Sequence, residues 1–267
     1  MISKVTEFIN HLVLNRNLLY QLTKRDLTQQ YRSSLLGIFW AVIEPITFML
    51  LLAFVFEVGL KAGKMMDVPF VAYIISGMSI FLLSSSVLGQ GAMIIKSNAY
   101  LLNKVNFKVS VLPIVKICSK TITHFFTLLP VLMILIFEGF YPNWYWIQTL
   151  YYLGALVFLL VGAVLLISAL AIFIPDIGNI VSIINRFLLY LSPVFWDISV
   201  FPTNVQTILK INPLYYIVSG YRESLLFNVG FWMHPYLTLY YWSFSLIIFI
   251  VGALIFRHLK PYFSDFV

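Results

Sequence analysis

The stretch TKRDLTQQYRSSLLGIFWAVIEP, residues 23–45, decides the fold of this chain. Its first half is basic and polar and ends at Ser33–Ser34, and from Leu35 the chain stays apolar to about Leu60. An apolar run of this length is enough to cross a bilayer as a helix. We therefore expect a first membrane-spanning helix at about 35–60, preceded by a charged collar at the membrane surface.

The overall composition indicates a membrane protein. Of the 267 residues, 61% are hydrophobic and only 10% are charged, whereas a soluble domain has about 45–50% apolar and about 25% charged residues. A chain of this length cannot bury so much apolar surface in one aqueous core, so the bilayer has to be its solvent. The long apolar runs also lack the alternation of β-barrel strands. We therefore predict an all-α polytopic membrane protein.

Six membrane-spanning helices are expected from the apolar runs. They cover about Leu35–Leu60, Phe70–Leu88, Val109–Phe137, Trp146–Ile174, Ile177–Phe195 and Tyr236–Phe256. Ahead of them, residues 2–14 have apolar positions at helical spacing but are too short to span, which favours an amphipathic helix in the membrane interface over a helix packed on the bundle. A second helical segment is expected at about 17–31.

The segment between the fifth and sixth spans, residues 196–235, has an unusual composition. It is too apolar for a solvated loop and too interrupted by Pro, Asn and Gly to span. Non-helical backbone at membrane depth has to be buried in protein or line a water-filled space. A pair of re-entrant helices satisfies both conditions, and a small extracytoplasmic cap is the alternative.

The positive charges predict the orientation of the chain. With the N-terminus in the cytoplasm, four of the 17 Lys and Arg residues lie outside (Lys61, Lys64, Lys210 and Arg222), which leaves thirteen inside. This bias predicts that both termini are cytoplasmic. It also explains the net charge of +7 without nucleic acid as a partner.

One domain is expected over residues 1–267. It would comprise a cytoplasmic interface region (1–34), five spans (35–195), an outer re-entrant region (196–235), the sixth span (236–256) and a cytoplasmic tail (257–267).

The sequence contains no recognisable motif for catalysis or cofactor binding. Its nearest match to a P-loop, GLKAGK at 59–64, is one residue short and lies on the predicted outer side. The four His residues and the single cysteine, Cys118, have no metal-ligand spacing. We therefore predict no enzyme activity, cofactor site or metal site in this chain.

Two features of the sequence are candidates for function on charge alone. Glu44 is the one carboxylate deep in a predicted span, and Pro45 after it frees a backbone carbonyl. We expect a kinked helix with Glu44 facing a polar lumen or a subunit interface; a structural hydrogen bond and a proton relay are the alternatives.

The loop from Lys96 to Lys120 has five lysines, no acid and interleaved apolar residues. It favours a docking helix for a cytoplasmic protein over a helix on the membrane surface.

A third feature is aromatic. Phe, Trp and Tyr make up 17% of the chain. Those inside predicted helices are candidates for the lining of a pore, because aromatic faces stack on the C–H faces of sugar rings, and lipid-facing packing is the alternative for each of them. The candidates are Phe39, Trp40, Phe48, Phe187, Tyr190, Phe195 and Trp196.

Four stretches taken together resemble a known family. They are LTKRDLTQQYRSSLLGIFWAVIEP (22–45), LLNKVNFKVSVLP (101–113), IPDIGNIVSIINRFLLYLSPVFW (174–196) and INPLYYIVSGYRESLL (211–226). In this order they resemble the permease subunit of ABC-2-type exporters of cell-surface polysaccharide, most of all O-antigen export permeases, with capsule and teichoic acid permeases as neighbours. Two positions depart from the family pattern: Pro175 stands where Arg is usual, and Lys108 stands where a proline is common.

The resemblance implies a function and its partners. Two copies of the chain would form a homodimer around a channel in the bacterial inner membrane, among membrane lipids. Two copies of a cytoplasmic P-loop ATPase, which would hold ATP and magnesium, would dock beneath it. The cargo would be a polysaccharide linked to a polyprenyl diphosphate. Exporters of teichoic acid, capsule, drugs or small lipids are alternatives in the same fold, and a membrane-embedded glycosyltransferase is a more remote one.

The same resemblance implies roles for three sets of residues. Access of the lipid diphosphate would involve Lys24, Arg25 and Arg32. Coupling to the ATPase would involve Tyr100, Leu101, Lys104, Phe107 and Lys108. The outer gate would involve Asn212, Pro213, Tyr215, Tyr216, Tyr221 and Arg222.

Overall fold

The computed structural model describes residues 16–32, 34–59, 61, 63–102 and 107–266. The interface helix expected at 2–14 and the coupling candidate Lys104 lie outside the described residues. The described chain is mostly helical, and its one sheet is a hairpin of two short antiparallel strands, β1 (Lys64–Met65) and β2 (Val68–Pro69).

Five helical segments of the described chain are long and apolar enough to cross a membrane. They are α3 (Trp40–Phe54) with the short turns η1 (Gly37–Phe39) and η2 (Val55–Gly59), α4 (Phe70–Gly91), α5 (Val111–Phe137), α6 (Gln148–Phe173) with η4 (Trp144–Ile147), and α10 (Pro235–Leu259) with η8 (Lys260–Tyr262) and α11 (Phe263–Phe266). The architecture is that of an all-α polytopic membrane protein, as the composition predicts.

The helix at the expected fifth span is shorter than predicted. It is α7 (Ile177–Leu191), with 15 residues, which corresponds to a length of about 22 Å against a hydrocarbon core of about 30 Å. The prediction extended this helix to Phe195. It ends earlier because Pro193 disfavours helical backbone at the residue before it, and Ser192 is extended, with φ −92° and ψ 148°.

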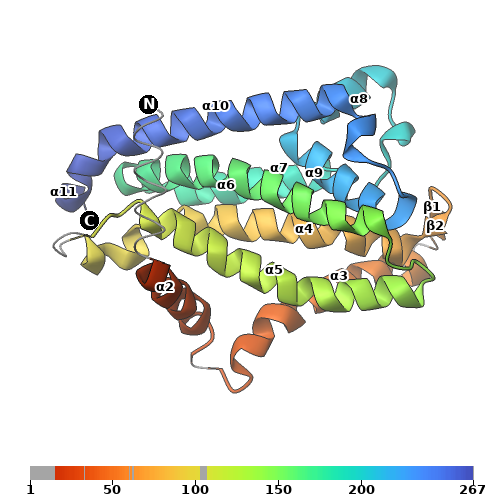
Figure 1. Cartoon of the computed structure of the whole chain (residues 1–267), viewed down its shortest axis with the longest axis horizontal. Coiled ribbons are helices and arrows are strands. Elements are labelled where there is room, and N and C mark those ends of the chain that lie inside the picture. The colour runs from red at the N-terminus through yellow and green to blue at the C-terminus, as the bar shows by residue number, and fades with distance from the viewer. Residues whose placement is uncertain (1–15, 33, 60, 62, 103–106, 267) are drawn as a thin grey trace.

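Figure 1 shows how the helices are arranged. α3, α4, α5, α6, α7 and α10 run along the long axis of the molecule. One end of the bundle, which we call the α2 end, holds α2 (Arg16–Gln29) and α11. The other, the hairpin end, holds β1–β2 and two short helices, α8 (Thr203–Lys210) and α9 (Pro213–Arg222).

Helix α4 lies at the centre of the bundle. It contacts α3, α5, α6, α7 and α9, and 72% of its apolar segment is buried, compared with 17% for the segment that contains α3. The core therefore forms around α4, α5, α6 and α9, while α3 lies at the periphery.

Helices α6 and α10 approach closely through two glycines. The backbone of Gly162 on α6 lies against Phe249 on α10, and Gly252 on α10 lies against the carbonyl group of Gly162. A side chain at either glycine would hold the two backbones apart. Small residues at such contacts are the usual means by which membrane helices pack closely, because burial in lipid supplies no hydrophobic driving force between them.

Replacing Gly162 with Ala tests this contact. The added Cβ would overlap the backbone of Phe249, so we expect a loss of about 1–3 kcal/mol of stability and a lower thermal midpoint of the detergent-solubilised protein. Gly154→Ala in the same helix is the matched control, because its Cβ would meet open space and Ala has the better helix propensity. Equal midpoints for the two variants would contradict the close approach.

Candidate functional site

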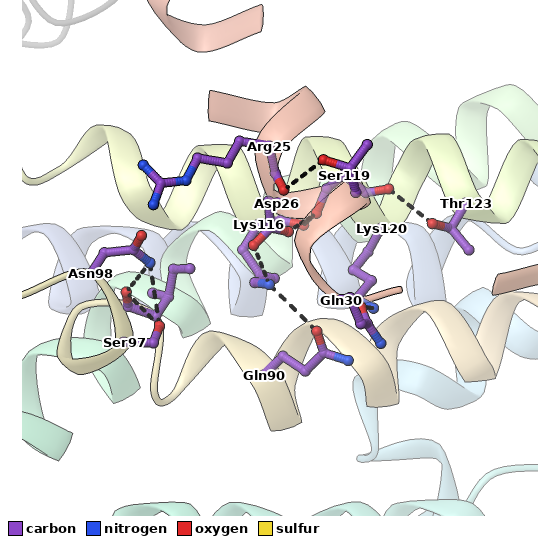
Figure 2. Close-up of polar contacts among 12 residues, drawn as sticks. Arg25, Asp26, Gln30, Gln90, Ser97, Asn98, Lys116, Ser119, Lys120 and Thr123 are labelled. Carbon is purple, nitrogen blue, oxygen red and sulfur yellow. Dashed lines mark hydrogen bonds and ion pairs between the residues drawn. The ribbon is translucent and has the colours of Figure 1, made fainter. Parts of the chain in front are cut away.

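Helix α2 is attached to the bundle by polar side chains. Thr23 is its one fully buried residue, and its leucines are at most half-buried. Lys116 of α5 forms an ion pair with Asp26, with 2.6 Å between Nζ and Oδ1. Ser119 of α5 donates a hydrogen bond to the other carboxylate oxygen of Asp26 at 2.5 Å. Figure 2 shows these side chains converging where α2 crosses α5.

A second lysine of α5 reaches the chain just after α2. Lys120 donates to Oε1 of Gln30 at 2.9 Å, and Lys116 also donates to Oε1 of Gln90 on α4 at 3.4 Å. Both lysines are only 8% exposed. The sequence-based interpretation of 96–120 as one basic loop is therefore wrong at its C-terminal part, because Lys116 and Lys120 belong to α5 and lie inside the bundle.

Two cavities flank this cluster. The first has a volume of about 320 Å³ and lies between α2, the end of α4 and α5; Arg25, Asp26, Gln90 and Lys116 are among its lining residues. The second has a volume of about 230 Å³ and lies between α3, α4 and α5. Its lining residues include Gln30, Tyr31, Ala41, Glu44, Pro45, Phe48, Ser79, Ser86, Gln90, Lys120, Thr123, His124 and Thr127.

Glu44 lines the second cavity, on the exposed face of α3. No ion pair is recorded for it within the described part of the chain. Tyr31, near the end of α2, lines the same cavity. Burial, and next the charge of Glu44, raise the pKa of the Tyr31 phenol above its ordinary value of 10.0, so this phenol stays protonated and remains a hydrogen-bond donor.

The three cations expected to attract a diphosphate do not form one site. Arg25 lines the first cavity, and its guanidinium lies 5.0 Å from the centre of the Tyr100 ring. Lys24 and Arg32 are exposed and line neither cavity. Lys116 and Lys120, by contrast, are buried between helices.

The coupling candidates lie at the α2 end and differ in exposure. Tyr100 belongs to the turn η3 (Lys96–Leu101) and is 44% exposed. Leu101 and Phe107 are half-buried and pack against the core, and Lys108 is half-buried. Among the described candidates, Tyr100 is therefore the side chain that a partner protein can reach most easily.

Arg222, at the hairpin end, is buried. It is 3% exposed and its guanidinium lies 3.6 Å from the centre of the Tyr73 ring. It donates to the carbonyl oxygens of Tyr73 at 3.1 Å and Val194 at 3.3 Å, and the Tyr73 hydroxyl donates to the carbonyl of Trp196 at 2.8 Å. Arg222 and Tyr73 together therefore fix the segment that follows α7.

The other gate candidates lie on or next to α9 and mostly have structural contacts. Asn212 caps the helix by accepting from the Leu214 amide at 3.0 Å, and Pro213 takes the first helical position, where its missing N–H has no cost. The remaining three, Tyr215, Tyr216 and Tyr221, are buried.

Two of these tyrosines join α9 to other helices. Tyr216 bonds to Tyr151 of α6 at 3.0 Å, and Tyr221 bonds to Nε2 of His124 on α5 at 3.2 Å. These contacts place the gate candidates together around one buried helix.

The channel candidates divide into two groups. Those on η1, α3 and α7 are exposed, and they are Phe39, Trp40, Glu44, Phe48, Phe187 and Tyr190. Phe195 and Trp196 are half-buried: the ring of Phe195 stacks on Phe56 with 5.8 Å between centres, and the Trp196 indole donates to the carbonyl of Tyr190 at 2.9 Å.

A groove of about 450 Å³ separates α3 from α7 along α4. It is lined by Phe48, Phe81, Leu82, Ser85, Ser86, Gly89, Gln90, Ser182, Asn185, Arg186 and Leu189. Its polar residues come from α4 and α7, whereas α3 contributes Phe48.

Sequence reasoning missed the polar face of α5, although a signal for it exists. Lys116, Lys120 and His124 are spaced by four residues, which places them on one face of a helix. His124 is 3% exposed. Three polar residues at this spacing inside an apolar run predict a buried polar face, and counting the two lysines as loop charges concealed it.

A double-mutant cycle on Asp26 and Lys116 measures how strongly α2 is attached. Removing one partner by Asp26→Asn or Lys116→Met leaves a partly buried polar group unpaired, for which we expect a loss of about 1–3 kcal/mol. We expect the double variant to lose less than the sum of the two. Thermal midpoints and the rate of proteolysis between α2 and α3 report the result, with Lys24→Met as an exposed control. Strictly additive losses would show that the pair does not hold α2.

Comparisons with known proteins assign the chain to a family. The sequence profile described as "ABC-2 type transporter" matches residues 17–226, from α2 to η6 (Glu223–Phe227). The "O-antigen export system permease protein RfbA" of Klebsiella pneumoniae is 26% identical over 253 residues, which are 93% of this chain and 94% of that protein. The protein of the same name from Myxococcus xanthus is 26% identical over 219 residues, 80% of this chain and 82% of its own length.

The resemblance seen in four stretches of the sequence is thus confirmed at the level of the family. The matched region contains the attachment of α2 to α5, both cavities, the groove between α3 and α7, and the buried helix α9. The chain belongs to the ABC-2 type transporter family.

Proposed function

We propose that this chain is the channel-forming permease subunit of an ATP-driven exporter, and that its cargo is a cell-surface polysaccharide of the O-antigen type linked to a polyprenyl diphosphate. The observation that carries the proposal is the groove of about 450 Å³ between α3, α4 and α7. The membership of the family and the names of two relatives, which are O-antigen export permeases, support it. The chain is a transport subunit and not the ATPase.

The lining of the groove suits a polar polymer better than lipid. Asn185 and Arg186 of α7 and Ser86 of α4 supply polar groups in helices where such groups are costly unless they face water or protein. The Asn185 amide donates to the carbonyl of Ser85 at 3.2 Å, which leaves its own oxygen as an acceptor. Phe48 adds an aromatic face for the C–H groups of a sugar ring.

A second copy of the chain would close the groove. Val181 is the one buried residue of α7, and Phe187 and Tyr190 are 63% and 68% exposed. A two-fold symmetric homodimer in which α3 and α7 of both copies face one another would turn these exposed rings into the lining of a continuous channel. Tyr190 and Phe187 would then contact the polymer during transport.

The partner ATPase would dock at the α2 end and hold the ATP and magnesium. Tyr100 is exposed there, beside Arg25. A change in the position of η3 would therefore act on α2 through the contact between these two side chains. The exposed Lys24 and Arg32 would attract the lipid diphosphate from the inner leaflet.

The charge bias gives the orientation of this assembly in the bacterial inner membrane. Both termini, and hence the α2 end, would lie in the cytoplasm. Helix α7 together with residues 192–196 would form the fifth crossing in chain order and bring the number of crossings to six. Helices α8 and α9 would re-enter from the outer side. Helix α9, which contacts α4 and α6, would then form part of the outer gate.

Removing a ring from the exposed face of α7 tests the proposal. Tyr190→Ala should reduce the rate at which polymer reaches the cell surface by about fivefold, equivalent to about 1 kcal/mol of lost ring contact. Phe126→Ala is the matched control, because Phe126 is an exposed ring, 54% accessible, on α5 away from the groove. Immunoblots of surface polymer, with permease amounts equalised, report the rates. Equal export by the two variants would contradict a channel lined by α7.

A further inference from the structure

We propose that the cavity of about 230 Å³ between α3, α4 and α5 binds the phosphorylated sugar headgroup of a membrane lipid. We call this site the Lys120 cavity. The inference rests on the proposed function, because the headgroup would be that of the lipid-linked cargo before it enters the groove between α3 and α7. It places the headgroup inside one protomer and not at the exposed cations of α2.

The Lys120 cavity reaches far into the bundle. Gln90 lies next to the α2 end of α4, and Ser79 lies about three turns farther along the same helix; both residues line the cavity. Three turns of helix are about 16 Å, which is half of a hydrocarbon core of about 30 Å. Polar side chains at this depth mark a functional site by default, because they are costly when they face lipid.

Lys120 supplies the group that would hold a phosphate. Its ammonium group has three hydrogen-bond donors, and one of them goes to Gln30 at 2.9 Å. Within the described chain no carboxylate lies within ion-pair distance of it, unlike Lys116, which Asp26 neutralises. A buried cation without a carboxylate partner is costly, and an anionic ligand would remove that cost.

The rest of the wall is rich in hydrogen-bond acceptors. The hydroxyls of Ser79, Thr123 and Thr127 donate to carbonyl groups of their own helices, at 2.9, 3.1 and 2.9 Å. Their protons are therefore used, and their oxygens would act as acceptors toward a ligand. The Glu44 carboxylate is a further acceptor. Pro45 has no N–H, which leaves the carbonyl oxygen of Ala41 without its helical partner. Sugar hydroxyls are the donors that such a wall needs.

A buried histidine forms part of the wall of the same cavity. His124 is 3% exposed, and its Nε2 is bonded to the hydroxyl of Tyr221 at 3.2 Å. His124 therefore connects the Lys120 cavity to α9.

The size of the cavity limits the ligand to a headgroup. Pockets for drug-sized ligands have volumes of about 300–1,000 Å³, so about 230 Å³ suits one sugar with its phosphate while the polyprenyl chain stays in the bilayer. The rings of Tyr31 and Phe48 form part of the wall and offer faces for the sugar. Glu44 would disfavour a diphosphate without a sugar, because its carboxylate repels negative charge. A sugar hydroxyl would instead donate a hydrogen bond to this carboxylate.

The test measures binding directly and not export. Purified permease in nanodiscs would be titrated with a fluorescent short-chain polyprenyl-diphosphate N-acetylglucosamine. We expect Lys120→Met to weaken binding by at least about tenfold, the loss of one charge-assisted hydrogen bond. Lys260→Met, a change of the same type at an exposed residue outside the cavity, should leave affinity unchanged. Glu44→Gln, on the opposite wall, should weaken binding of the sugar-bearing probe more than binding of polyprenyl diphosphate alone.

Competition distinguishes the sources of the ligand chemistry. The inference predicts that inorganic diphosphate and phosphatidylethanolamine displace the probe poorly. Equal displacement by inorganic diphosphate would show a free-phosphate site, equal displacement by phosphatidylethanolamine would show an ordinary lipid site, and either result would overturn the inference. If Lys120→Met lowers the thermal midpoint, the milder Thr123→Val keeps the test valid, because it too should weaken binding.

Failure of this inference and failure of the proposed function give different results. Suppose that the wild-type permease binds the probe and supports export, and that Lys120→Met and Thr123→Val both bind the probe with unchanged affinity. The Lys120 cavity would then be rejected as the headgroup site, while the proposed export function would stand. A wild-type permease that neither binds the probe nor supports export of any polymer would contradict both the headgroup site and the proposed export function.

Discussion

The ion pair between Lys116 and Asp26 is the contact on which the α2 end depends. A lysine within an apolar helix has to find a partner inside the protein, and α2 supplies one with a separation of 2.6 Å between Nζ and Oδ1. Because no apolar residue of α2 is fully buried, this pair and its neighbours contribute strongly to holding it against α5. Gln30, which follows α2 and bonds to Lys120, lines the cavity between α3, α4 and α5.

Polar contacts also link the two ends of the bundle. His124, which lines the Lys120 cavity, bonds to Tyr221 on α9 at 3.2 Å. The next residue, Arg222, bonds to the carbonyl of Val194 just after α7. The proposed headgroup site and the proposed outer gate thus share a short series of hydrogen-bonded residues. This continuity is structural, and energetic coupling between the two sites is a separate question that double-mutant cycles address.

The sequence predicted the fold where one physical effect dominates. Long apolar runs locate five candidate spans, because the bilayer requires about 20 apolar residues in a helix whatever the tertiary contacts. The prediction was wrong for the end of α7, where Pro193 acts locally, although the proline was visible. It was also wrong for Lys116 and Lys120, whose burial depends on Asp26 and Gln30, both distant in sequence. No pattern within one segment predicts which distant acceptor will meet a lysine or arginine.

Under the proposed function, the permease would take a polar headgroup at the α2 end and pass a polymer along α3 and α7. The most direct test of this account is to delete the gene in its own bacterium and determine on which side of the inner membrane the lipid-linked polymer accumulates. The account predicts that polymer collects on the cytoplasmic side and returns to the surface when the chain is expressed again. A deletion strain with normal surface polymer and no internal accumulation would contradict it.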